Sequence, residues 1–142
     1  MYDPKPFAAL AVGDRAVMTK TVTEADGALY IAATGDFGPV HVDEGYAAGT
    51  RFGRRLAPGI MVAGLCTSVL TAELAGTLGV SIEDNFRFTG PVFYGDTLTV
   101  EVWIAALHSE TRMAVWEASA RNQDGLEVLQ ARATLKYPRP RS

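Results

Sequence analysis

The feature that most constrains this chain is the segment PGIMVAGLCTSVLTAELAGTLG (58–79), which carries apolar or small side chains on nearly every side. Proline and glycine at its start and Gly79 at its end are the arrangement typical of a helix. A helix without a polar stripe is normally buried. The rest of the sequence should therefore contain the layer that buries this helix.

Four strand-like runs follow the predicted helix and show the period-two pattern of half-buried strands. They are EDNFRFTGPVFYGD (83–96), DTLTVEVWIAAL (96–107), RMAVWEASARN (112–122) and LEVLQARATLKY (126–137). The turns YGD, HSET and NQDG between them predict an antiparallel meander. A helix of about 20 residues and a strand of about nine residues both span about 30 Å. We therefore predict an α+β fold in which a curved antiparallel sheet wraps around a long buried central helix, the hot-dog architecture.

The residues before the long helix predict three smaller elements, from alternating polarity and from capping residues. These are a strand over Arg15 to Val22, a helix capped by Thr23 that ends near Thr34 at Gly35, and a short helix over 43–53 capped by Asp43.

Composition excludes several classes of protein but does not indicate an activity. The chain has 142 residues and a formal net charge of −3, so we expect no nucleic-acid partner. Its single cysteine, Cys66, rules out an internal disulfide, fits a reducing cytoplasm, and is expected to be a small core residue. The opening MYDPKPFAALAVGD lacks the cationic and apolar regions of a signal peptide, and the most apolar stretch, Ile60 to Ala72, is too short to span a membrane. We expect one cytoplasmic domain over residues 1–142.

One short loop combines the residue types that acid–base chemistry needs. In TGDFGPVHVD (34–43), Asp36 and His41 stand five residues apart around a Gly-Pro break. Taken alone, an aspartate in such a loop is more often a turn or cap residue, and a histidine beside a helix start is often structural.

Residues 33–65 resemble the signature of the MaoC-like, or R-specific enoyl-CoA hydratase (hydratase 2), family. The family pattern is G-D-x-N-P-x-H-x-D, then A, then F-G, then H-G and a helix of small residues; this chain has GDFGPVHVDEGYAAGTRFGRRLAPGIMVAGLCTS. The stretch FTGPVFYGDTLTVEV also resembles the strand after the helix in that family, so the likeness extends over most of the chain. Two positions depart from the pattern: Gly38 stands for the family asparagine, and Pro58 for the histidine of the His-Gly pair.

The resemblance implies hydration of 2-enoyl thioesters and dehydration of 3-hydroxyacyl thioesters, carried by CoA or by an acyl carrier protein. Water adds at C3 and a proton arrives at C2, chemistry suited to a carboxylate and an imidazole. The resemblance makes Asp36 and His41 the catalytic pair, and gives the N–H of Gly59, at the start of the buried helix, to the developing oxyanion. It implies no metal, and no cofactor besides the CoA or phosphopantetheine arm of the substrate.

The resemblance also suggests four substrate-binding residues: Gly38, Pro58, Thr67 and Arg54. Because Gly38 and Pro58 lack the polar side chains of the family, we expect a bulkier, branched or functionalised acyl group. Thr67 could equally bond its own helix turn. The cluster of Arg51, Arg54 and Arg55 could meet substrate phosphates, or could simply be solvated.

Other functions stay open. A hot-dog thioesterase would use Asp36 to direct water at the thioester carbonyl and would release free CoA. A non-catalytic acyl-binding or assembly module would follow if Asp36 and His41 were out of mutual reach.

The second histidine, His108, lies in a turn and is expected to be exposed. A sheet on one helix leaves an open edge, and hot-dog proteins generally pair such edges, so we expect a homodimer or a higher homo-oligomer.

Overall fold

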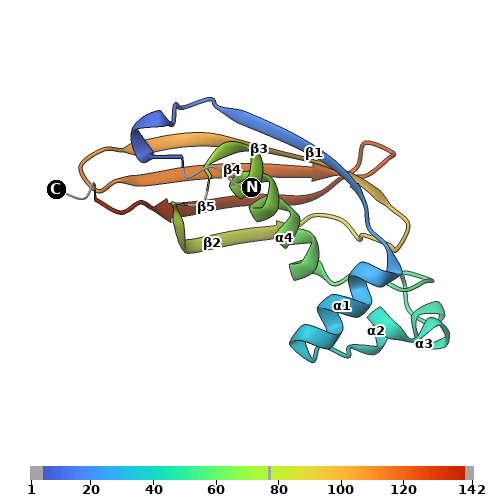
Figure 1. Ribbon diagram of the computed structural model, residues 1–142. Helices are drawn as coiled ribbons and strands as arrows, with labels where there is room; N and C mark the ends of the chain where they lie inside the picture. Colours follow the sequence, from blue (N-terminus) through green and yellow to red (C-terminus); the bar gives the residue numbers. More distant parts are fainter. Residues whose placement is uncertain (1–4, 77, 140–142) are drawn as a thin grey trace.

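The computed structural model describes residues 5–76 and 78–139. Its centre is a five-stranded antiparallel sheet in the order β1-β3-β4-β5-β2 (Figure 1). The strands are β1 (Arg15–Thr21), β2 (Val80–Phe88), β3 (Thr97–His108), β4 (Met113–Arg121) and β5 (Glu127–Lys136). A one-turn helix, η1 (Phe7–Ala9), precedes β1.

Helix α4 (Gly59–Val69) lies against one face of this sheet and continues into the π-helical turn η2 (Leu70–Leu74). Its side chains Val62, Cys66 and Val69 are at most 1% exposed. They belong to one core with the inward-facing residues of the strands, among them Leu98, Val100, Val102, Ile104, Leu129, Ala131, Ala133 and Leu135. The predicted architecture, a curved antiparallel sheet around a buried helix, is confirmed.

The buried helix is shorter than its sequence pattern predicts. The pattern extends to Gly79, whereas η2 ends at Leu74, and the Ala75 N–H closes the last turn on the Leu70 carbonyl at 2.6 Å. Gly76 then has a φ of 66°, the left-handed conformation that commonly ends helices. Thr77, inside the predicted helix, lies outside the described residues. Within the described ranges, no helix is long and apolar enough to cross a bilayer.

The predicted meander of four strands is wrong in one connection. Strands β3, β4 and β5 are consecutive neighbours, but β2 pairs with β5, and β1 occupies the remaining edge of β3. The connection between β2 and β3, residues 89–96, is longer than a tight hairpin loop. It crosses the end of the fold and brings Phe93 into a bridge with Leu56. The run predicted as a strand, 83–96, is also only partly right, because β2 covers Val80–Phe88 and residues 89–96 form the connection. A period-two pattern carries no information about which strands are neighbours.

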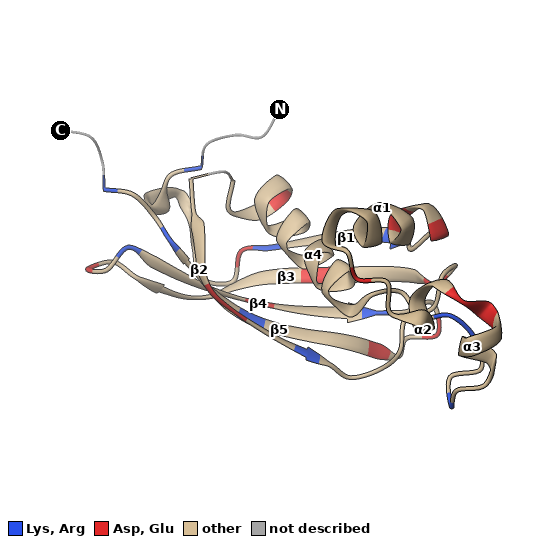
Figure 2. Ribbon diagram, turned by 90° about the horizontal axis from the view of Figure 1, so that it is seen from below, with Lys and Arg blue, Asp and Glu red and all other residues tan. Residues whose placement is uncertain are grey.

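Three short helices lie together beyond one end of the sheet, around the start of α4, and Figure 2 shows the acidic residues on two of them. They are α1 (Glu24–Thr34), α2 (Pro39–Val42) and α3 (Glu44–Ala48). The start and end of α1 are as predicted, with a capping box at Thr23 and a left-handed Gly35. The helix predicted over 43–53 is shorter. Asp43 does cap it, but Gly49 follows its last residue, and α2 precedes it as a separate turn that contains His41.

Candidate active site

His41 lies on α2, where Pro39 at the first helical position favours a short turn. Its ring is held by the main chain, because Nδ1 lies 2.9 Å from the Leu56 carbonyl oxygen. A carbonyl only accepts, so Nδ1 carries the proton and donates, and in the neutral ring Nε2 keeps a free lone pair. The Leu56 N–H in turn donates to the Val40 carbonyl at 3.0 Å. The imidazole therefore presents a proton-accepting nitrogen in a fixed orientation.

Asp36 is exposed in the turn between α1 and α2. Its N–H donates to the Thr34 hydroxyl at 3.3 Å, and its Oδ1 lies 3.4 Å from the Gly38 nitrogen. A Cβ atom at Gly38 would be 3.4 Å from Asp36 Oδ1, 3.3 Å from His41 Cδ2 and 3.7 Å from His41 Nε2. The carboxylate and the imidazole thus both lie next to the α-carbon of Gly38, on the same side of it.

A cavity of about 400 Å³ opens beside His41, at the N-terminal end of α4. Its walls come from the segment before α4, from α4 itself and from the sheet: His41, Arg51, Phe52, Leu56, Ala57, Gly59, Val62, Phe88, Thr89, Gly90, Pro91, Val92 and Val128. The lining is mostly apolar, and among these residues only His41 and Arg51 are ionisable. Asp36, Gly38 and Pro58 are not part of this wall. The cavity has the character of an apolar acyl site with a proton-accepting group at its mouth.

Gly59 faces this cavity as the first residue of α4. Pro58, before it, is buried and provides no side-chain cap, and the N–H groups of a first turn have no intrahelical acceptors. A Cβ atom at Gly59 would lie 3.0 Å from one carbon of the Phe88 ring and 3.3 Å from two others. Glycine is therefore needed for close approach of the ring, and the helix start remains able to donate to a negative oxygen.

Three further residues from the sequence analysis lie outside the cavity wall. The Thr67 hydroxyl donates to the Gly64 carbonyl of its own helix at 2.8 Å. Cys66 is fully buried, as expected of a core residue, and burial raises the pKa of its thiol from 9.0 to about 12. His108 is exposed at the end of β3, as predicted.

The three arginines have different surroundings. Arg51 lines the cavity, with its guanidinium 4.8 Å from the centre of the Phe52 ring. Arg54 instead stacks over Phe93 at 3.9 Å and is not part of the wall. Arg55 donates to Glu44 Oε2 at 2.7 Å and pairs with Glu24 on α1; the bond to Glu44 raises the pKa of its guanidinium. Arg51 is thus the cation best placed to meet a ligand in the cavity.

Sequence reasoning missed part of this site. Leu56 acts through its carbonyl, which every residue type has, so no sequence signal could have identified it. Phe52 and Phe88 form aromatic walls, but each lay inside an element predicted for other reasons. Only the exposure of Phe88, 49% despite its place in a strand, marks it as more than a core residue, and exposure is visible only in the structure.

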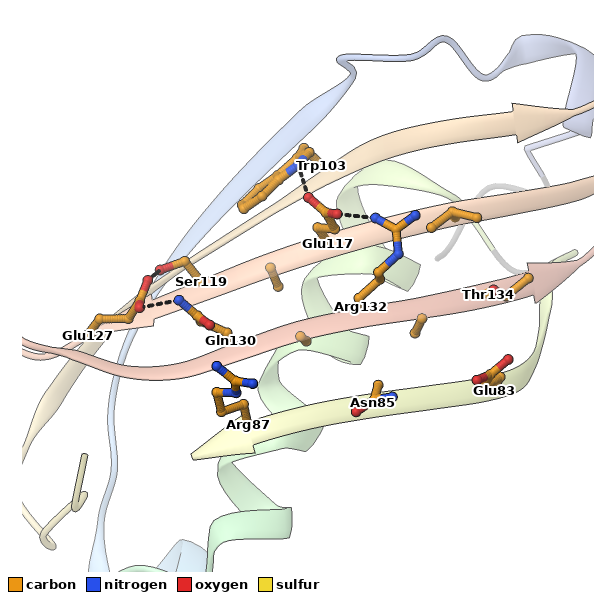
Figure 3. A pocket seen from close by; sticks show the side chains of 14 residues that line it. Glu83, Asn85, Arg87, Trp103, Glu117, Ser119, Glu127, Gln130, Arg132 and Thr134 are labelled. Carbon is orange, nitrogen blue, oxygen red and sulfur yellow. Dashed lines mark hydrogen bonds and ion pairs between the residues drawn. The ribbon is translucent and has the colours of Figure 1, made fainter. Parts of the chain in front are cut away.

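A larger hollow of about 590 Å³ lies on the face of the sheet away from α4, and Figure 3 shows two groups of its polar side chains that bond to one another, one around Glu117 and one around Glu127. Glu117 accepts from Trp103 Nε1 at 3.2 Å and also from Arg132. Glu127 accepts from the Ser119 hydroxyl at 2.7 Å, a bond that lowers the pKa of this carboxyl. Because these groups satisfy one another far from the Asp36–His41 pair, we place the candidate active site in the smaller cavity.

Comparisons with known proteins find relatives in both sequence and structure. The family model described as "MaoC like domain" matches residues 11–123. A 3-hydroxybutyryl-CoA dehydratase of Methylorubrum extorquens is 35% identical over 133 residues, which cover 94% of this chain and 84% of that protein. An (R)-specific enoyl-CoA hydratase of Aeromonas caviae is 32% identical, over 91% of this chain and 96% of that protein. The unliganded R-hydratase PhaJ1 from Pseudomonas aeruginosa superimposes with a TM-score of 0.85 at 32% identity, over 95% of this chain and 86% of that one.

Proposed function

The chain belongs to the MaoC-like domain family, and from that premise we propose how its site works. Like the relatives it matches, it is a hydratase and dehydratase of acyl thioesters, interconverting 2-enoyl and 3-hydroxyacyl forms. We assign the proton transfers to Asp36 and His41, and the stabilisation of the enolate to the N–H of Gly59. The observation that supports this most is the bond from His41 Nδ1 to the Leu56 carbonyl, which leaves Nε2 free beside the cavity.

In the hydration direction, water lies between the Asp36 carboxylate and the His41 ring. The carboxylate accepts a hydrogen bond from the water, and His41 Nε2 takes its second proton as the oxygen adds to C3. The electron pair of the double bond moves to the thioester oxygen, where the N–H of Gly59 and the helix N-terminus stabilise the negative charge. The proton on His41 then passes to C2, which completes the addition of one water. Dehydration is the same path reversed, and neither direction requires a metal or a further cofactor.

The proposal also covers the thioester carrier and the acyl chain of the substrate. Arg51 at the cavity rim is placed to meet a phosphate of CoA or of a phosphopantetheine arm. The prediction of a bulkier acyl group rests on the sequence alone, because neither Gly38 nor Pro58 lines the cavity and a Cβ atom at Gly38 would already lie 3.3 Å from His41 Cδ2. A preference for crotonyl-CoA over longer or branched enoyl-CoA thioesters would contradict this prediction.

The test of the function follows two products in one reaction. Loss of the enoyl-thioester absorbance reports hydration, and release of free thiol reports thioester hydrolysis. We expect hydration without thiol release in the wild-type protein, and loss of hydration in His41→Ala. Thiol release without hydration would show a thioesterase instead, and neither signal over a range of acyl chains would leave an acyl-binding module.

We further propose that the chain forms a homodimer through β2. This strand ends the described sheet, so one of its edges has no strand partner there, and its apolar side chains Val80, Ile82 and Phe88 are 65%, 55% and 49% exposed. Phe88 and the residues after it line the cavity, so a partner on this edge would complete the site. Sedimentation at micromolar concentration should give twice the chain mass of 15.2 kDa, and Ile82→Lys should shift it toward the monomer. A stable wild-type monomer would contradict the assembly.

A further inference from the structure

The two proposed catalytic side chains lie on the group of short helices, not on the body of the fold. Asp36 and His41 belong to α1–α3 and their connections, whereas Gly59 and Phe88 belong to α4 and the sheet (Figure 1). Proton transfer requires the two parts to hold a relative position within a fraction of an ångström. Some contact must therefore fix the helices against the body.

The segment 93–96 is rigidly attached to the body. The Gly95 N–H donates to the Val22 carbonyl at 2.7 Å, and the Val22 N–H donates to the Asp96 carbonyl at 2.8 Å. The Asp96 side chain is 4% exposed and accepts from the Phe93 N–H and from Gln123 Nε2, both at 2.9 Å. A residue in this segment is consequently a firm support for anything that it contacts.

Tyr94 extends from this support to the short helices. Its hydroxyl donates to the main-chain carbonyl of His41 at 3.2 Å. Its ring covers Gly27 of α1 so closely that a Cβ atom there would lie 2.5 Å from Cε1 and 2.7 Å from Cζ. Burial raises the pKa of Tyr94, so its hydroxyl keeps the proton that it donates. The ring also explains why a glycine stands at position 27. The interior of a helix disfavours glycine, but here only glycine leaves room for the Tyr94 ring.

Arg55 adds a third contact to the same ring. Its guanidinium lies 5.4 Å from the centre of the Tyr94 ring, within cation–π range, and pairs with Glu24 of α1 and Glu44 of α3. Tyr94 and Arg55 therefore connect all three short helices at one place, and one of the connections is the backbone of His41 itself.

We propose that Tyr94 is a positioning residue for His41: it holds α2 against the body so that the imidazole keeps its place between the Leu56 carbonyl and the cavity. This inference rests on the proposed acid–base role of His41. It differs from a general stabilising role because the hydroxyl acts on the residue that carries the proton.

Tyr94→Phe tests the hydroxyl alone, since the ring stays over Gly27 and under Arg55. We expect kcat to fall about 10-fold with KM within about twofold, because a small displacement of a catalytic group costs turnover more than binding. Tyr137→Phe is a matched control: the Tyr137 hydroxyl donates to the Ala75 carbonyl at 2.9 Å, at the opposite end of the long helix. This control should lower the melting temperature and leave kcat unchanged.

The position of the ring can be measured without turnover. The chain has 2 histidines, so a ¹⁵N spectrum of the imidazoles contains His41 and, as an internal reference, exposed His108. In the wild-type protein His41 should show a single tautomer protonated at Nδ1. In Tyr94→Phe its signals should move toward an average of both tautomers while those of His108 stay in place.

A second variant approaches the same contact from the other side. Gly27→Ala places a methyl group against the Tyr94 ring and should lower kcat at least as much as Tyr94→Phe. In a Tyr94→Ala background the same methyl meets no ring, so adding it should change kcat less than about twofold. Equal effects of Gly27→Ala in both backgrounds would show that it acts through the helix and would count against the proposal.

The outcomes separate this inference from the function. If Tyr94→Phe keeps full kcat and an unchanged His41 spectrum while His41→Ala is inactive, the positioning role is wrong and the acid–base assignment stands. If His41→Ala keeps full turnover, the acid–base assignment fails and the positioning role fails with it.

Discussion

Near each end of the long helix a tyrosine hydroxyl donates to a main-chain carbonyl, to Ala75 at the C-terminal end and to His41 of α2 beside the N-terminal end. At the C-terminal end, Tyr137 is 1% exposed, its ring meets Phe7 edge to face at 5.6 Å, and its hydroxyl closes on the Ala75 carbonyl. At the N-terminal end, Tyr94 is only half-buried and donates to His41, beside an open cavity. The C-terminal end of the helix is closely packed, whereas the N-terminal end lies beside exposed polar groups. From this difference we expect substitutions at the C-terminal end to affect mainly stability, and substitutions at the N-terminal end to affect mainly turnover.

The largest effect is expected from removal of the proposed catalytic pair. Asp36→Asn and His41→Ala should each lower turnover at least about 100-fold, since positioned acid–base groups contribute factors of about 10² to 10⁴. The free energy of unfolding should change little, because Asp36 is exposed and His41 half-buried. Steady-state hydration rates and urea unfolding measure the two quantities. His41→Asn is the control, because it retains a donor for the Leu56 carbonyl and removes Nε2; activity in that variant would exclude Nε2 as the base.

The next effect concerns the start of α4. Gly59→Ala places a Cβ atom 3.0 Å from the Phe88 ring, so the ring or the helix start must move. We expect a loss of turnover of about 10-fold, because a preorganised donor is sensitive to small shifts. Adding Phe88→Ala should recover part of the lost rate by removing the obstacle. No loss in Gly59→Ala would mean that this helix start does not bind the oxyanion.

At the C-terminal end of the long helix we expect the opposite result, a loss of stability without a loss of turnover. Tyr137→Phe leaves the buried Ala75 carbonyl without its donor and should cost about 1–3 kcal/mol in free energy of unfolding. Turnover, measured at a temperature where both proteins are folded, should equal that of the wild type. A drop in turnover comparable to that of Tyr94→Phe would show that the two ends are coupled through α4.

The smallest effect lies between the ends, at Cys66. Its pKa is raised to about 12 by burial, from 9.0, so the folded state holds the thiol proton more tightly than the unfolded state. The stabilisation from this difference is complete below pH 9 and is lost as the pH rises toward 12. Relative to Cys66→Ala, the wild-type protein should lose about 1.4 kcal/mol of unfolding free energy per pH unit above 9. Equal pH slopes between pH 8 and 10.5 would show that the thiol is not shielded.

The sequence predicted those parts of the fold in which the polarity of the side chains indicates which of them are buried. The helix predicted over 58–79 is buried on the face that carries Val62, Cys66 and Val69, although it ends at Leu74 and leaves Ile60 59% exposed. Alternation located β3, β4 and β5. The roles of Asp36, His41 and Gly59 came from a resemblance to a family motif and stay a prediction. That residues 1–142 form one domain stays a prediction.

What the sequence did not reveal depends on contacts between distant segments. The pairing of β2 with β5 is decided by the path of residues 89–96, which no local pattern specifies. The role of the Leu56 carbonyl could not be predicted from residue types, because every residue has a main-chain carbonyl. Gly27 looks like a weak point in a helix until Tyr94, 67 positions later, is seen to fill the space above it.

The order of the strands also has a consequence for how the molecule assembles in time. Strands β3, β4 and β5 follow one another in the chain and pair with their immediate neighbours, so this hairpin unit closes only short loops. Strand β1 must find β3 across most of the sequence, Arg15 opposite Trp103, with the whole of α1–α4 and β2 between them. Loop closure over such separations is slow and entropically unfavourable. We therefore predict that the C-terminal hairpins form the folding nucleus, and that the helices that carry Asp36 and His41 are added late and open first when the native state fluctuates.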